Sequence, residues 1–406
     1  MSGAAAVTPR PAHVPAHLVV DFDYRNFDGH ETDVHRAWKK LHDGPDIFWS
    51  PRHGGYWVAT RAEDIDVMQT DHERFSYRHV TVPPNDGFPP LAPLEFDPPQ
   101  HGPLRAIISP AFGPRPMQEI ETDLRKLSAQ LLGRILPVGK CDFVDAYAKR
   151  LPIVTFLRLV DLPLGDREHL LELTELSVRP KSQQDQATAF NGLQAYTVKW
   201  IRERRERPGP DLFSRIVNAR VGDRPLTDAE LSGMLSNVIF GGLDTVASAL
   251  AFTARCLAEN PLLRTQLAAD RKLIPAAIEE FLRRFGIPNT AREITHDFEY
   301  KGVNFRKGEQ VLLSKTLHGL DERRFTDPLA VDFKRPRYSH AAFGDGPHRC
   351  PGSFLARLEM KVFLEQWLER IPDFSVQPGE QVRTSSGPVN GVLYLPLVWP
   401  SAPEHV

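Results

Sequence analysis

The chain has 406 residues, which is enough for one large domain or for two or three ordinary ones. Apolar residues make up 41 % and charged residues 25 %, an ordinary globular balance that can bury a sizeable core. Because the formal net charge is only −2, the chain has no general attraction to nucleic acid, and we expect no nucleic-acid partner.

Three cysteines, Cys141, Cys256 and Cys350, leave an odd thiol and form no Cys-x-x-Cys pair. This pattern argues against a disulfide framework or a structural zinc site, and for a reducing compartment. The first residues hold several prolines and no apolar run, which is typical of neither a signal peptide nor a membrane anchor. We therefore expect a cytoplasmic protein without a membrane partner. Because no linker, charge run or repeat divides the chain, we expect one domain over residues 1–406.

The N-terminal part predicts short elements. Residues 1–30 form an extended, proline-punctuated arm, and apolar residues then recur at helical spacing over residues 32–43. Two apolar runs, residues 46–50 and 56–60, flank a Gly-Gly turn and predict a β-hairpin. A short helix is expected over residues 62–70.

Residues 79–103 form a long stretch without a predicted element. Eight prolines in this stretch exclude a long helix. A loop of this length inside a domain is typical of a functional lid, so we predict a lid over residues 79–103. At its end, His101 and Arg105 lie one helical turn apart and can share a face. Taken alone, that pair fits a solvated polar face at least as well as a binding site.

Several amphipathic helices follow the lid. A polar run over residues 180–186 separates the last two and is predicted to be a hinge. Helices joined in this way commonly open and close over a pocket, but the pattern itself shows only a helix-loop-helix. The predicted helices span residues 117–135, 143–160, 165–177 and 187–206.

A long apolar helix is predicted over residues 227–260. It begins at a capping box formed by Thr227 and Glu230 and runs without proline to Asn260. Some 30 residues of helix span about 45 Å, which is enough to cross a domain. Because apolar residues lie nearly all round it, we expect this helix to be buried in the core.

The middle of this helix carries Gly241-Gly242 followed by Asp244-Thr245. Each glycine costs roughly 1 kcal/mol against alanine, so either something approaches the backbone here or the helix bends. An acid beside an alcohol in an apolar helix also needs partners. A packing notch, with the threonine bonded back to its own helix, would explain these residues equally well.

The C-terminal part combines one more helix with strands. A helix over residues 275–285 carries Glu280 and Arg283 as an (i, i+3) acid–base pair, which on an exposed helix would contribute only a few tenths of a kcal/mol. The predicted fold class is therefore mainly α with a minor β portion. The strand patterns lie at residues 298–305, 310–314 and 374–399.

Cys350 lies in a loop with glycines on both sides, which lets the backbone fold tightly around the sulfur. Pro351 is predicted at the first position of a helix that runs to residue 368. The sulfur would then lie at the positive end of that helix, which favours a thiolate. Such a cysteine could be a nucleophile, a metal ligand or a packed core residue. A hydrolase would need a histidine base and an orienting group, and His348 in the same tight loop is poorly placed for this.

The pattern Phe-Gly-x-Gly-x-His-x-Cys-x-Gly, complete from Phe343 to Gly352, resembles the haem-binding loop of the cytochrome P-450 monooxygenases. The resemblance covers nearly the whole chain. It implies the fold of that family, a triangular-prism helical body with a long central helix. It also implies haem b as the cofactor, with the Cys350 thiolate as the axial ligand of the iron and residues 343–352 as the haem-thiolate loop.

The sequence Gly-Gly-x-Asp-Thr resembles the oxygen-binding groove of the same family. The resemblance implies that Gly241 and Gly242 make room for dioxygen over the iron. It further implies that Thr245 hydrogen-bonds the oxygen species and that Asp244 gates proton delivery. Controlled proton supply matters because the distal oxygen must leave as water, whereas uncontrolled protons would release hydrogen peroxide.

The resemblance assigns two further groups of residues. Haem propionates are carboxylates, so basic donors would neutralise them through charge-assisted hydrogen bonds. These donors would be His101, Arg105, Arg292 and His348. A buried structural Glu-Arg-Arg network that shapes the haem-side loop would be formed by Glu280, Arg283 and Arg335.

The chain is most similar to the bacterial camphor 5-monooxygenase branch, but its substrate region departs from it. The camphor enzyme has a tyrosine hydroxyl in its lid, where this chain has an apolar run around Phe88 and no hydroxyl. A pocket that loses a polar anchor discriminates differently, so we expect a terpenoid or norisoprenoid substrate and poor binding of camphor. The expected pocket residues are Phe88, Asn237, Phe240, Pro288 and Val389.

Pro351 is a second departure. The camphor enzyme has a residue with a backbone N–H directly after the cysteine, whereas proline has none. Hydrogen bonds to a ligating sulfur raise the potential of the iron, so we expect a lower potential here.

The implied function is that of an oxidoreductase, a monooxygenase that hydroxylates an unactivated C–H bond of a small apolar substrate with O2 and two electrons. The resemblance implies a small acidic [2Fe-2S] ferredoxin and its NADH-dependent reductase as electron donors, and we expect a monomer. A haem-thiolate sensor without turnover and a peroxide-driven peroxygenase are the alternatives, and the intact Asp244-Thr245 pair argues against both. Candidates for the ferredoxin-docking face are Arg74, Arg105, Arg337, Arg349 and Arg357.

Overall fold

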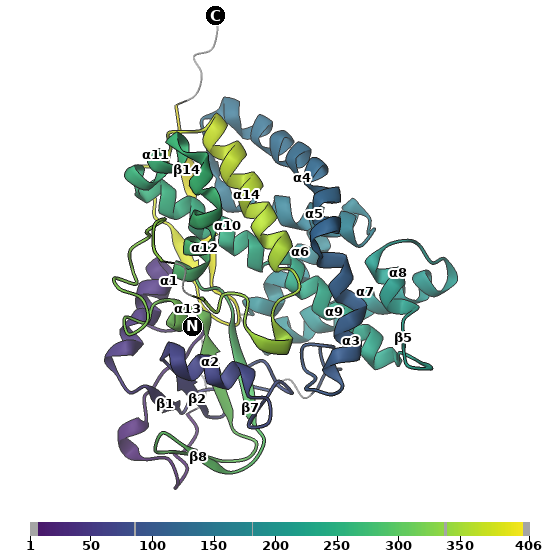
Figure 1. Ribbon diagram of the computed structural model, residues 1–406, viewed down its shortest axis with the longest axis vertical. Helices are drawn as coiled ribbons and strands as arrows, with labels where there is room; N and C mark the ends of the chain where they lie inside the picture. Colours follow the sequence, from purple (N-terminus) through teal and green to yellow (C-terminus); the bar gives the residue numbers. More distant parts are fainter. Residues whose placement is uncertain (1–6, 85–86, 181, 337–338, 401–406) are drawn as a thin grey trace, which may run out of the picture.

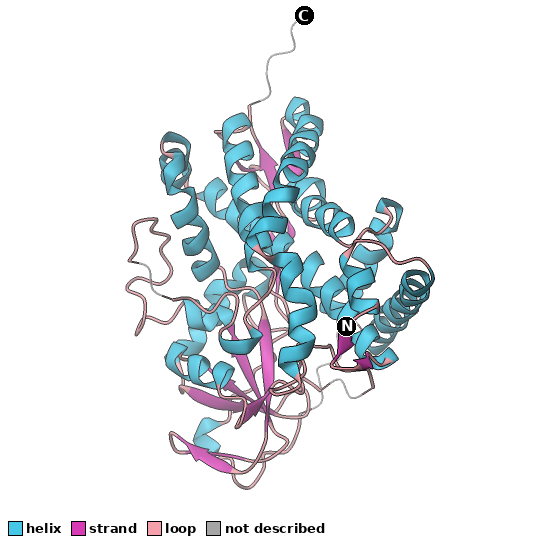
Figure 2. Cartoon of the chain, turned by 45° about the vertical axis from the view of Figure 1, so that its right-hand side comes forward, coloured by secondary structure: helices cyan, strands magenta, loops and turns pink. Residues whose placement is uncertain are grey.

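The structure of the chain, a computed structural model, describes residues 7–84, 87–180, 182–336 and 339–400. Helices make up the upper and right-hand body in Figure 1, and the largest sheet lies at the lower end. Figure 2 shows the strands gathered at that lower end, with a smaller group near the top. Helices hold 52 % of the residues, which confirms a mainly α fold with a minor β portion.

The helices of the N-terminal half lie before and after the lid and the polar run along the chain. They are α1 (His30–Lys39), α2 (Ala62–Thr70), α3 (His101–Ile108), α4 (Pro114–Ile135), α5 (Arg150–Leu159), α6 (Arg167–Val178), α7 (Gln183–Glu206) and α8 (Leu212–Val217). The C-terminal half contributes α9 (Asp228–Leu243), α10 (Thr245–Glu259), α11 (Pro261–Ala269), α12 (Ile274–Arg284), α13 (Lys315–Gly319) and α14 (Ser353–Arg370).

The largest sheet has the strand order β1-β2-β10-β7-β3, in which β10 runs parallel to β2 and the other pairs are antiparallel. Its strands are β1 (Ile47–Ser50), β2 (Tyr56–Ala59), β10 (Gln310–Ser314), β7 (Asn289–Ile294) and β3 (Phe75–Ser76). A second sheet pairs β11 (Ser375–Val376), β14 (Pro396–Val398) and β4 (Lys140–Asp142). The remaining strands form the hairpins β5 (Arg220–Val221) with β6 (Arg224–Pro225), β8 (Phe298–Tyr300) with β9 (Val303–Phe305), and β12 (Arg383–Ser385) with β13 (Gly391–Tyr394).

Several local predictions are confirmed. The helix expected over residues 62–70 is α2, and the hairpin expected at residues 46–60 is the β1–β2 pair. The capping box at the start of α9 is complete, because the Glu230 N–H donates to Thr227 Oγ1 at 3.2 Å and Glu230 Oε2 accepts from the Thr227 N–H at 2.7 Å. Of the lid expected over residues 79–103, the described part up to residue 100 contains neither helix nor strand, whereas residues 101–103 already belong to α3.

Two local predictions are wrong. The polar run is not a hinge throughout, because Ser182 caps α7 by accepting a hydrogen bond from the Asp185 N–H at 3.1 Å, and the glutamines that follow are helical. Pro351 does not begin the helix after the cysteine. Helix α14 starts at Ser353 with Gly352 as its N-cap, so the cysteine lies in the turn before the helix. At α7 the side-chain cap of Ser182 sets the start, whereas Gly352 makes no side-chain cap at the start of α14.

The central helix is interrupted once. Asp244 separates α9 from α10, and both helices are buried over most of their length. Residues 228–259 are long and apolar enough to cross a membrane, but 67 % of the most apolar window is buried inside the protein. Burial in the core therefore accounts for their apolar character, as expected for the central helix.

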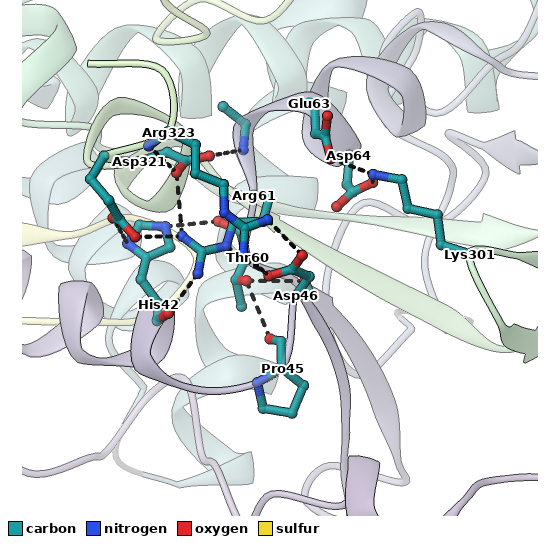
Figure 3. Close-up of polar contacts among 12 residues, drawn as sticks. His42, Pro45, Asp46, Thr60, Arg61, Glu63, Asp64, Lys301, Asp321 and Arg323 are labelled. Carbon is teal, nitrogen blue, oxygen red and sulfur yellow. Dashed lines mark hydrogen bonds and ion pairs between the residues drawn. The ribbon is translucent and has the colours of Figure 1, made fainter. Parts of the chain in front are cut away.

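An ionic network around the buried Arg61 and Asp321 fixes the start of α2 against the segment that follows α13 (Figure 3). Arg61 donates to Asp46 at 2.8 Å and to the carbonyl of His42 at 2.6 Å. Asp321 caps α2 from a distance of 259 residues in sequence, because its Oδ2 accepts from the Ala62 N–H at 2.8 Å. These charges are paired and hydrogen-bonded, which is the condition under which buried charges are tolerated. The network joins the loop before β1 and the segment after α13 to the start of α2.

Candidate active site

The loop before α14 folds around Cys350. Gly344 and Gly346 have φ angles of 69° and 64°, which glycine adopts without steric cost. The Cys350 N–H donates to the carbonyl of Phe343 at 2.8 Å and closes the loop. Cys350 is exposed, although many protein atoms lie around its sulfur and keep bulk water away from it. The sulfur therefore borders an open space rather than packed core.

The charge state of the sulfur depends on opposing influences. Burial raises the pKa of the Cys350 thiol, while the Gly352 N–H and the neighbouring Arg105, Arg357 and Arg349 lower it. A coordinated metal ion would reverse the effect of burial, because a thiol that binds a metal is deprotonated outright. The sulfur is therefore suited to ligate a metal.

Four basic side chains, called here the basic cluster, gather beside this loop. They come from α3, from β7 and from the 3-10 turn Gly346–His348, which are far apart in the sequence. The rings of two of them, His101 and His348, lie 4.1 Å apart between centroids, and Tyr77 stacks on the latter at 3.5 Å. The members of the basic cluster are His101, Arg105, Arg292 and His348.

No member of the basic cluster forms an ion pair with an acidic side chain of the described residues, although Asp97 lies near enough to favour the charged forms of His101 and Arg292. His101 Nε2, Arg292 Nε and both ring nitrogens of His348 are buried without a hydrogen-bond partner. Burial lowers the pKa of His101 and Arg292, and burial together with the neighbouring cations lowers the pKa of His348 to about 2. Arg105 donates to the backbone carbonyl of Arg349. Buried donors that crowd together without an anion are the setting that bound carboxylates would satisfy.

The central helix has open space beside only one of its two glycines. A Cβ atom at Gly241 would have nothing within 4 Å, whereas one at Gly242 would lie 2.6 Å from Cδ2 of Phe156. Thr245 Oγ1 donates to the carbonyl of Gly241 at 3.1 Å. The first glycine thus faces open space, and the second allows close packing against Phe156.

Asp244 is held by a residue that sequence reasoning missed. Its two carboxylate oxygens accept from the Arg179 guanidinium at 3.0 Å and 2.9 Å, and both side chains are 10 % exposed. Arg179 also donates to Glu175 and to Ser385 Oγ, each at 2.9 Å. Burial opposes the charge of Arg179, but the carboxylates outweigh burial and raise its pKa. Because the pair spans 65 residues, no local sequence signal reveals it.

Comparisons with known proteins agree with this geometry. The family model for cytochrome P450 matches residues 166–397. The chain is 33 % identical over 402 residues to the probable cytochrome P450 127A1 of Sinorhizobium fredii, covering 96 % of this chain and 97 % of that protein. The chain belongs to the cytochrome P450 family. As a member of this family, it is a haem-dependent monooxygenase and an oxidoreductase.

This cytochrome P450 is also similar to a second curated relative and to a solved structure. Nocardicin C N-oxygenase of Nocardia uniformis is 33 % identical over 358 residues, covering 84 % of this chain and 89 % of that protein. The crystal structure of CYP101J2 superposes with a TM-score of 0.88 and 38 % identity, covering 97 % of this chain and all of that one. That structure represents the camphor-type branch, to which the sequence pointed.

The residues of this cytochrome P450 fit haem. An accessible sulfur, buried donors without anions and an open glycine in the central helix are the features that a thiolate-ligated, dicarboxylate macrocycle requires. Cys350 would hold the iron, and the basic cluster would hold the propionates. Phe343, whose carbonyl closes the loop, lies partly buried beside the cysteine, with the Arg357 guanidinium 4.5 Å from its ring centroid.

The expected pocket residues fall into separate groups. Asn237 and Phe240 lie on α9, where the Asn237 amide donates to the carbonyl of Ala92 in the lid at 3.2 Å. Phe88 contacts Phe190 of α7, with ring centroids 3.2 Å apart. An isolated β-bridge pairs the remaining two, Pro288 and Val389. The structure thus brings Pro288 and Val389 together and joins Asn237 to the lid.

The Glu-Arg-Arg residues meet in one buried cluster. Glu280 accepts two hydrogen bonds from Arg283, both at 2.8 Å, and a third from Arg335 at 2.9 Å. Arg283 also donates to the carbonyls of Gly319 and Pro328 at 2.6 and 2.8 Å. Arg283 therefore ties α12 to the end of α13 and to the segment that follows α13, before the cysteine loop.

Proposed function

We propose that this cytochrome P450 hydroxylates an unactivated C–H bond of a small apolar substrate, with electrons from a ferredoxin. When bound, haem supplies the reduction of dioxygen and the oxidation of the C–H bond. The observation that carries the proposal is the Asp244-Thr245 pair at the break of the central helix, where Thr245 is bonded to Gly241 and Gly241 faces open space. Cys350 and the basic cluster would bind and orient the cofactor against this groove.

Proton delivery is assigned to Asp244 and Thr245. Arg179 holds both oxygens of the Asp244 carboxylate and prevents the side chain from rotating. Asp244 therefore passes a proton toward Thr245 only when this ion pair breaks. The Thr245 hydroxyl donates to Gly241 at rest and can accept a hydrogen bond at the same time, which suits it to pass a proton on. A sensor without turnover or a peroxygenase has no use for such a controlled supply.

The lid supports an apolar substrate of terpenoid or norisoprenoid type. Phe88 and Phe190 close on each other, and Phe240 lies partly buried on α9. A substrate panel scored by the change in iron spin state tests this, and we expect apolar terpenoids to shift the spin state and camphor to do so weakly. Tight binding of camphor with full conversion would contradict this substrate class.

The ferredoxin-docking face is assigned to the surface around the cysteine loop. Arg349 is exposed there, and the nearby Phe354 is 51 % exposed at the start of α14. Other candidates have partners of their own, because Arg357 pairs with Glu279 and Arg74 with Asp71, while Arg337 lies outside the described residues. Replacing Arg349 by alanine should weaken reduction by an acidic ferredoxin at low salt, and salt-independent kinetics would contradict the assignment.

The decisive test of the function is spectroscopic and kinetic. Reduced protein with carbon monoxide should show the long-wavelength absorption of a thiolate-ligated haem, and the Cys350→Ser variant should lose it. Turnover with NADH, a reductase and a [2Fe-2S] ferredoxin should then give a hydroxylated product. Folded haem protein that binds substrate but yields neither product nor peroxide would favour a sensor. We further propose a cytoplasmic, monomeric, single-domain enzyme, which size-exclusion chromatography and limited proteolysis can test.

A further inference from the structure

One face of α9 is shaped to receive the lid. A Cβ atom at Gly233 would overlap the carbonyl oxygen of Pro90 and would lie 3.1 Å from the amide nitrogen of Ala92. One helical turn later, the Asn237 side chain donates to the carbonyl of Ala92 at 3.2 Å. Residues four apart on a helix lie on the same face, so a notch and a donor adjoin there.

The lid segment that meets this face is compact in its own right. Glu95 Oε2 accepts from the Leu91 N–H at 2.8 Å, and the Glu95 N–H donates to the Leu91 carbonyl at 2.9 Å. Glu95 Oε1 also accepts from the Val80 N–H at 3.3 Å, which ties this turn to the strand side of the lid. Ala92 is fully buried. These hydrogen bonds tie the segment together, so a displacement at its contact with α9 would be passed on to its neighbours.

We infer that Gly233 and Asn237 form a seat on α9 for lid residues 90–92, and that this seat sets how large a molecule can enter the pocket. The far end of the same segment carries Phe88, which contacts Phe190 of α7. The contact of residues 90–92 with α9 thus also fixes the position of Phe88 against α7. The inference rests on the proposed function in one respect, because it takes the gap between the lid and α7 as the substrate entrance.

Glycine at position 233 and asparagine at position 237 explain why the lid contacts α9 at this place. At Gly233 the neighbour is lid backbone rather than a flexible side chain, so any larger residue must displace the lid. At Asn237 a side-chain amide is the donor, whereas the apolar residues around it on this helix offer none. Both residues are seat positions and neither belongs to the haem-binding groups described above.

The test uses the haem-loaded protein and two nitrogen ligands of haem iron, imidazole and the bulkier 4-phenylimidazole. In the Gly233→Ala and Asn237→Ala variants, stopped-flow association of 4-phenylimidazole should speed up by roughly two- to tenfold, the range that loss of one ordinary hydrogen bond gives. Association of imidazole should change little. Alanine strengthens the helix at both positions, so α9 itself should remain intact.

A second readout follows the lid directly. Backbone amides of residues 87–97 should exchange with deuterium faster in both variants, while those of α9 should not. Gly133→Ala is the matched control, because it adds the same methyl group to a helix with nothing within 4 Å. Unchanged exchange in both seat variants, an equal gain for both ligands, or the same changes in the control would overturn the inference. The exchange readout does not depend on turnover, so failure of the proposed function would show separately, as an absent thiolate spectrum or absent product.

Discussion

At the scale of single residues, Arg179 is the group on which control of Asp244 depends. Its guanidinium joins the break of the central helix to Glu175 on α6 and to Ser385 on β12. Space for it is provided by Gly391 on β13, because a Cβ atom there would overlap Nη2 of Arg179. Removing one partner of a buried charge pair is costly, so the position of this guanidinium determines whether Asp244 is paired.

The Gly391→Ala variant should therefore act on proton control. The added methyl group meets the far end of a flexible side chain, so we expect Arg179 to move while the fold persists. Asp244 would then lose the guanidinium that holds both of its carboxylate oxygens. We expect a several-fold rise in peroxide released per NADH consumed, measured against product formed.

The matched control for this variant is Ser385→Ala. It removes only the hydrogen bond to Nε of Arg179 and leaves the two bonds to Asp244 in place. Its peroxide yield should stay near that of the unmodified protein. A Gly391→Ala enzyme with unchanged coupling would show that the ion pair does not govern proton delivery.

Pro351 offers a test of the sulfur environment. The Gly352 N–H already interacts with the Cys350 sulfur, but proline at the intervening position contributes no donor. In Pro351→Leu the new N–H would draw charge from the sulfur, and the iron reduction potential should rise. Spectroelectrochemical titration measures this, with the exposed Pro347→Leu of the same loop as the control. Equal potentials in Pro351→Leu and the unmodified protein would contradict the expected effect.

At the scale of elements, the two glycines of the central helix should respond in opposite ways. In Gly242→Ala, contact with Phe156 should cost about 1–3 kcal/mol of unfolding free energy, more than the roughly 1 kcal/mol that alanine returns to a helix. In Gly241→Ala the methyl group enters open space, so stability should rise slightly while carbon monoxide binds more weakly. Denaturant titration and CO titration separate the two. Similar stability changes in both variants would contradict open space beside only one of the two glycines.

Element boundaries show how far sequence patterns reach. The capping box at Thr227 and the helix over residues 62–70 were predictable, because each is specified by neighbouring residues. The start of α7 was not, because the Ser182 cap outweighs a polar run that lacks apolar periodicity. The start of α14 was not, because the turn that presents the cysteine uses Gly352 as the N-cap.

At the scale of the whole molecule, the site is assembled from segments that no local pattern connects. Motif resemblance named Cys350, His101 and Arg292, and the structure gathers the cysteine loop, α3 and β7 around one space. Long-range contacts such as Arg179 with Asp244, or Asn237 with the lid, depend on tertiary packing and have no signature in sequence. The proposals on proton supply and substrate entry rest on these contacts.

One buried acid links the stability of the whole molecule to pH. Glu359 on α14 is 1 % exposed, and neither carboxylate oxygen has a hydrogen-bond partner among the described residues. Burial raises its pKa from 4.5 to about 8, against a smaller opposing influence of Thr155, whose hydroxyl donates to Leu151. Between these two pKa values the folded state keeps the proton that the unfolded state releases. Stability contributed by this group is therefore fully present below pH 4.5 and is lost as pH rises toward 8.

The Glu359→Gln variant should flatten that dependence. Glutamine keeps a neutral side chain at every pH, so its stability relative to the unmodified protein should grow between pH 5 and pH 8 by roughly a few kcal/mol at most. Denaturant unfolding of the haem-loaded protein across this range measures the difference. Glu369→Gln, which changes an exposed acid on the same helix, should leave the pH profile unaltered. Parallel profiles for Glu359→Gln and the unmodified protein would mean that the buried carboxyl is already ionised in the folded state, and that a cation or water reaches it inside the core.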